Sequence, residues 1–159
     1  MGRLLFSFGG AGKAVKTHVL VLVPYEVPGS DLGDALMSRL EQHRRVESDE
    51  SPRLSRFDYL VGAFGKTLND PIAEGRLPEQ ERSAWSGNVC DKSRVPLDFV
   101  PGALVTLGGA WHDLSDFGWR MVDGASAANQ NSLARWSAHY RALLAAAPEC
   151  WGLEVWAHS

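Results

Sequence analysis

The feature that most constrains the fold is a continuous run of apolar and β-branched residues, Thr17–Val23, which Pro24 ends. A run of this length is typical of a buried β-strand. Behind it, Ser30 can cap a helix in which leucines recur every four residues along one face, at Leu32, Leu36 and Leu40. The start of the chain therefore predicts a strand followed by an amphipathic helix.

Later segments predict the remaining elements. A second strand is expected at Phe57–Val61. A hairpin is expected at residues 103–114, where two five-residue runs, ALVTL and AWHDL, flank Gly108 and Gly109. The apolar spacing of Gln130–Ala146 predicts a long helix, and Gly152–Ala157 predicts a last strand. In that strand alternation places Leu153 and Val155 on one face, and Glu154, Trp156 and His158 on the other.

The order strand, helix, strand, hairpin, helix, strand indicates a split βαβ arrangement in a single domain over residues 1–159. We therefore expect a ferredoxin-like α+β fold, an antiparallel sheet with two helices on one face and an added hairpin strand. Residues 1–16 form a flexible or edge-strand arm in this interpretation, and Thr67–Pro96 a long insertion loop. The open sheet face carrying Trp156 would favour a homodimer or a partner that covers it.

The hairpin fixes an expected register. If Leu107 pairs with Ala110 across a two-residue turn, Val105 lies opposite His112, and Thr106 lies opposite Trp111. His112 would then be a hydrogen-bonded sheet residue on a mainly apolar face.

Composition excludes several classes of protein. The formal charge of −3, from 16 basic and 19 acidic residues, does not favour a nucleic-acid partner. No segment approaches the length of a membrane span, so we expect a cytoplasmic protein without a membrane partner. Cys90 and Cys150 have no metal-ligand spacing and are predicted to be reduced thiols, with one disulfide left open.

Motifs for cofactor or metal chemistry are weak. GGAGK lacks the first glycine and the hydroxyl residue of a phosphate-binding loop, because Ser7 and Ala14 occupy those positions. His112, Asp113 and Asp116 resemble half of a metal site, but neighbouring residues of a strand point to opposite faces. We therefore expect no cofactor and no metal.

Several short patterns resemble small accessory proteins of tailed phages and prophages, especially those of actinobacteria. The matching residues, about 70 in all with their surroundings, include Phe57, Asp58, Tyr59, Leu104–Leu107, Trp111, His112, Gly118, Trp119, Trp136 and Val155 through His158. That group has Gly-Gly-Arg-Trp where this chain has Gly62, Ala63, Phe64 and Gly65, so the arginine is missing or replaced by Lys66. The resemblance implies a phage origin, hence a host cytoplasm, and no particular activity.

Two functions remain open at this point. The first is a non-catalytic accessory or anti-host protein that binds a host protein or a small molecule through an aromatic surface. Its binding residues would be Tyr59, Trp111, Asp116, Trp119 and Trp156. The alternative is a small cofactor-free enzyme of the dimeric ferredoxin-like barrel type with an acid–base pair in an apolar pocket. Its catalytic residues would come from His112, Asp58 and His158.

Overall fold

The computed structural model describes residues 3–4, 6–8, 15–44, 56–57, 59–62, 89–119 and 126–158. Its strands are β1 (Arg3–Leu4), β2 (Phe6–Phe8), β3 (Val15–Pro24), β4 (Tyr59–Gly62), β5 (Val89–Asp91), β6 (Phe99–Val100), β7 (Ala103–Val105), β8 (Trp111–Asp113) and β9 (Cys150–His158). Two α-helices, α1 (Leu32–Glu41) and α2 (Ala127–Ala146), accompany them. Short 3₁₀ turns are η2 (Gly29–Asp31), η5 (Lys92–Arg94) and η6 (Leu114–Phe117).

The sheet is centred on β3 and β9, which pair antiparallel from Lys16↔His158 to Pro24↔Cys150. On the side of β9 away from β3, β4 and β5 pair with successive stretches of β9. On the side of β3 away from β9, β2 and β7 pair with successive stretches of β3. β8 pairs with β7 and forms the edge of the sheet. The β3–β7 pairing is parallel, so the expected antiparallel sheet is in fact mixed. β3, α1 and β4 form the predicted split βαβ unit, because β9 lies between the two strands.

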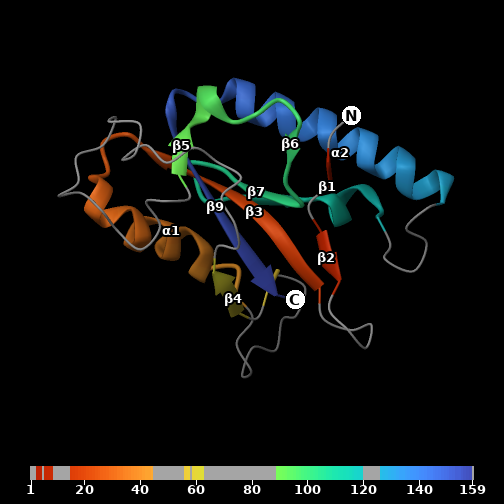
Figure 1. Cartoon of the computed structure of the whole chain (residues 1–159), viewed down its shortest axis with the longest axis horizontal. Helices are drawn as coiled ribbons and strands as arrows, with labels where there is room; N and C mark the ends of the chain where they lie inside the picture. The colour runs from red at the N-terminus through yellow and green to blue at the C-terminus, as the bar shows by residue number, and fades with distance from the viewer. Residues whose placement is uncertain are drawn as a thin grey trace.

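The two helices cover opposite faces of this sheet, as Figure 1 shows. On the face that we call the α1 face, Leu32, Leu36 and Leu40 pack against Val19, Val21 and Val23 of β3. On the other, the α2 face, Trp136 and Tyr140 pack against Leu20, Leu22 and Leu104, together with residues of the segment 89–100. The expected ferredoxin-like layout with both helices on one face is therefore wrong. The sheet face that was expected to be open, and therefore to favour a homodimer, is covered by α2.

The predicted hairpin forms, but its register differs by one residue. The structure pairs Val105 with Trp111 and Leu104 with His112. Gly109 has φ +87° and its amide donates to the Thr106 carbonyl, so the loop contains Leu107 as well as both glycines. A shift of one residue exchanges the two faces of a strand. Trp111 therefore lies on the α1 face and His112 on the α2 face, the reverse of the expected arrangement.

Other element boundaries differ by a few residues. α2 begins earlier than predicted because Ser126 caps it, its hydroxyl accepting from the Asn129 amide. Within the N-terminal arm, β2 pairs with β3. The expected insertion ends earlier, since β5 pairs with β9, and its residues 67–88 lie outside the described residues. Cys90 and Cys150 are free and buried. No helix within the described ranges is long and apolar enough to cross a membrane.

Candidate functional site

The chain leaves the sheet at η6, just after the edge strand β8. Asp113 is the N-cap of η6: its carboxylate accepts from the Asp116 amide at 3.2 Å, and the Asp116 carboxylate accepts from the Asp113 amide at 2.9 Å. Such a reciprocal capping box satisfies two amides at the start of a helical turn. Gly118, with φ +87°, ends the turn in the left-handed conformation that glycine adopts readily. The backbone of this corner is thus fixed at both ends, and we call Asp113–Trp119 the η6 corner.

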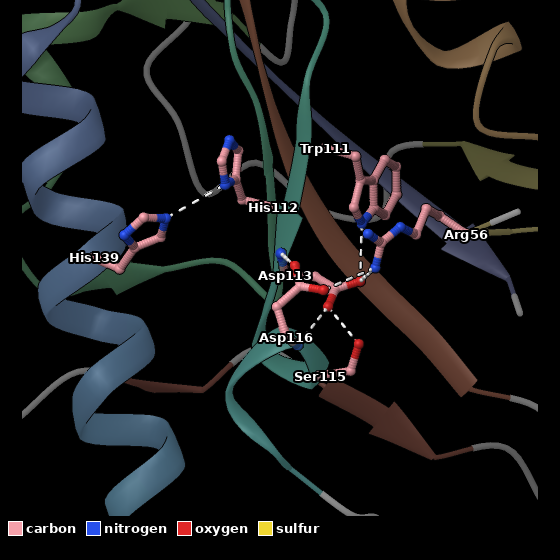
Figure 2. Close-up of polar contacts among 7 residues, drawn as sticks. All are labelled: Arg56, Trp111, His112, Asp113, Ser115, Asp116 and His139. Carbon is pink, nitrogen blue, oxygen red and sulfur yellow. Dashed lines mark hydrogen bonds and ion pairs between the residues drawn. The ribbon is translucent and has the colours of Figure 1, made fainter. Parts of the chain in front are cut away.

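An ion-pair network ties the corner to the segment before β4. One guanidinium nitrogen of Arg56 lies 3.3 Å from an Asp113 oxygen and 3.1 Å from an Asp116 oxygen. The Asp113 carboxylate also accepts from the Trp111 indole nitrogen at 2.9 Å and from the Ser115 hydroxyl. Figure 2 shows these donors converging on Asp113. One cation against two carboxylates leaves the network with one net negative charge.

Trp111 supports this network from inside the fold. The residue is 8% exposed, and its indole stacks on Phe57 with ring centres 5.9 Å apart and lies 5.6 Å from the His43 ring. The hairpin register explains this placement, because pairing with Val105 turns Trp111 towards α1. Trp111 therefore presents little surface to a binding partner, contrary to its expected use as an anchor.

His112 projects to the opposite side of β8, towards α2 (Figure 2). Its Nδ1 atom lies 3.3 Å from Nε2 of His139, and both side chains are partly exposed. Burial lowers the pKa of His112, the neighbouring imidazole of His139 lowers it further, and the Asp116 carboxylate acts against these effects. His112 is therefore held towards its neutral form.

Two partly exposed aromatic residues, Phe117 and Trp119, lie on the η6 corner, and Phe117 contacts the histidine pair. Phe117 and Trp119 each pack one side against the core beneath α2. The ring of Phe117 lies 5.2 Å from that of His139, and the exposed Arg135 places its guanidinium 5.4 Å above the Phe117 ring. Asp116, with its side chain 38% exposed, lies on the same corner. Asp116 and Trp119, two of the predicted binding residues, thus both lie on the η6 corner.

The other predicted site residues lie elsewhere. Trp156 is in β9, where its ring stacks on His18 with centres 4.5 Å apart. Tyr59 and His158 pair across β4 and β9 at the far end of the sheet from β8. The side chain of Tyr59 and the whole of Asp58 lie outside the described residues. Among the described residues, the expected aromatic surface is therefore divided between two places, and at the η6 corner it lies beside the Arg56–Asp113–Asp116 network.

A second polar pair, which the sequence interpretation did not identify, is buried on the α2 face. His18 Nε2 donates to a Glu154 carboxylate oxygen at 2.8 Å, and the side chains are 1% and 2% exposed. Trp156 stacks on one side of the imidazole and Phe99 meets it edge-on at 5.1 Å. His18 Nδ1 is buried and finds no hydrogen-bond partner. Strand alternation could have placed Glu154 on this face, but pairing it with His18 requires the β3–β9 register.

In the part of the chain that the structure describes, no group of three or more His, Cys, Asp or Glu side chains is arranged to hold a metal ion. The chain matches no known protein family, no curated protein and no solved structure in the comparisons made.

Proposed function

We propose that the protein acts by binding, as a non-catalytic accessory protein, and that it holds a host protein at the η6 corner. The observation that carries the proposal is the placement of Phe117 and Trp119, half-exposed on a corner whose backbone the Asp113 network fixes. Aromatic side chains held in this way supply large contact area at little cost in side-chain entropy, which is why they are enriched in binding hot spots.

The charges at the corner favour a protein as the partner over a small molecule. Asp116 and Arg135 are exposed around the aromatic rings, one on η6 and the other on α2. An apolar centre with a charged rim is the arrangement found in protein–protein interfaces. Asp116 would orient a cationic or hydrogen-bonding group of the partner, while Trp119 would supply the apolar contact.

A small acid–base enzyme is the second candidate, and the His18–Glu154 pair favours it. A carboxylate that accepts from one imidazole nitrogen makes the other nitrogen a better base, as in the orienting pairs of hydrolases. Here that other nitrogen, Nδ1, is unpaired. A base must however contact its substrate, and His18 is 1% exposed. Binding at the partly exposed η6 corner therefore ranks first.

Site-specific photo-cross-linking tests the binding proposal. Trp119 is replaced by a photoreactive phenylalanine analogue, and Tyr25, which is 39% exposed in the turn after β3, receives the same replacement as a matched control. Each protein is irradiated in lysate of the organism that carries the gene, and adducts are identified by mass spectrometry. We expect one recurrent protein adduct from position 119 that is absent from position 25. Identical adduct patterns from the two positions would refute the proposal.

A further inference from the structure

We infer that His112 and His139 form a two-nitrogen chelating site for a tetrahedral divalent cation of the zinc type. This inference concerns the nitrogens that face each other in Figure 2, His112 Nδ1 and His139 Nε2, and it does not rest on the proposed binding function. Neutral imidazole is a preferred ligand of Zn²⁺, and the two rings come from rigid elements, β8 and α2.

The separation of the two nitrogens matches the spacing of two ligands around one zinc ion. With Zn–N bonds of about 2.05 Å and a tetrahedral angle, two nitrogen ligands lie about 3.3 Å apart. The observed distance is 3.3 Å. A square-planar ion such as Cu²⁺ would hold neighbouring nitrogens about 2.9 Å apart, which fits less well.

The orientation of the rings supports the same conclusion. Two imidazoles in a linear hydrogen bond at this distance would have ring centres about 5.6 Å apart, because both rings would lie along the bond. Two imidazoles inclined towards a shared tetrahedral ion have centres about 5.2 Å apart. The centres of His112 and His139 are 5.2 Å apart. In the metal-free protein the two nitrogens contact each other directly, and the cation would lie between them.

The surroundings hold the ligands in place and allow access. Phe117 and Trp136 lie against the His139 ring, with centres 5.2 and 6.3 Å away, and fix its orientation on α2. The nearby ion-pair network contributes one net negative charge, since Asp113 and Asp116 outnumber Arg56; the exposed cation Arg135 opposes it. Both histidines are partly exposed, so water can complete the coordination.

Zinc titration of the full-length protein tests the site. Affinity is measured by competition with a chromophoric chelator for the wild-type protein, His112→Thr and His139→Ala. The control is His43→Gln, which changes a partly exposed histidine that contacts Gly109 on the other side of the hairpin. We expect one bound ion per chain, at least tenfold weaker binding in each of the two ligand variants, and wild-type affinity in the control.

The imidazole nitrogen resonances of the wild-type protein provide a second measurement that needs no variant. Zinc should shift the signals of His112 Nδ1 and His139 Nε2 together and leave those of His18 and His43 unchanged. Absence of one-to-one binding, equal binding by all variants, or shifts confined to other histidines would each overturn the inference.

Discussion

The Trp111 indole nitrogen donates to the Asp113 carboxylate at 2.9 Å. The same carboxylate caps η6, so it accepts both from a side chain of the edge strand β8 and from the backbone of η6. That carboxylate also receives Arg56 and Ser115. Asp113 is therefore the residue on which the shape of the η6 corner depends most.

Replacing Asp113 with alanine should destabilise the protein strongly. The change removes an N-cap, worth about 1 kcal/mol, and leaves the indole donor of a buried tryptophan unpaired, at about 1–3 kcal/mol. We expect a loss of about 2–4 kcal/mol in the free energy of unfolding, measured by urea denaturation. Asp116→Ala, at a more exposed carboxylate, should cost about 1 kcal/mol or less. Equal losses in the two variants would show that the corner does not depend on Asp113.

Gly109→Ala should also be destabilising, for two separable reasons. At φ +87° a β-carbon is strained, which costs about 1–2 kcal/mol, and here it would lie 2.5 Å from the Gln42 amide nitrogen. Gly108→Ala is the matched control, since the nearest atom to its β-carbon is 4.0 Å away. Gln42→Ala alone removes the hydrogen bond to the Gly109 carbonyl, so in that background Gly109→Ala should cost only the backbone part of the loss. Thermal unfolding of the wild-type protein, the three single variants and the double variant measures both parts.

The hairpin shows what the sequence could and could not predict. The two glycines correctly indicated a turn between two short strands. Whether the loop contains two or three residues depends on which glycine takes the left-handed conformation, and the pattern of residues does not decide this. That one residue determines which of Trp111 and His112 is buried against α1.

The sequence could have predicted that helices cover both faces of the sheet. Val19–Val23 is apolar at every position, with no polar residue facing solvent, and such a run is typical of a strand covered on both faces. The structure buries all five residues, between α1 on one side and α2 on the other. In contrast, the contacts of His139 with His112 and of Arg56 with Asp113 join elements 27 and 57 residues apart, and only the tertiary fold defines them.

Removing one member of the His18–Glu154 pair should lower the free energy of unfolding more than replacing both members with apolar residues. His18→Ala removes the imidazole that donates to a buried carboxylate, and we expect a loss of about 3–5 kcal/mol in the free energy of unfolding. The double variant His18→Leu/Glu154→Met replaces both groups with apolar ones and should be more stable than His18→Ala. Chemical denaturation measures both. A double variant less stable than the single one would indicate that the pair contributes net stability.

Stability should depend on pH through His112. Its pKa in the folded protein lies below the ordinary 6.5, chiefly because of burial, so the unfolded chain takes up the proton first as pH falls. The stability contributed by neutral His112 is present above pH 6.5 and is lost as pH decreases below it. An NMR titration of the imidazole should give a midpoint below 6.5 in the wild-type protein and a higher one in His139→Ala. A midpoint that does not change in His139→Ala would contradict the assigned contact.

The affinity of Trp119→Ala for the cross-linked partner tests the central claim most directly. As the anchor of the η6 corner, Trp119 should contribute about 2 kcal/mol or more, which corresponds to roughly 30-fold weaker binding in calorimetry. Tyr25→Ala should bind as the wild-type protein does, and both variants should unfold cooperatively. Wild-type affinity in Trp119→Ala would contradict the account, and a lowered melting temperature as its only effect would make Trp119 a packing residue.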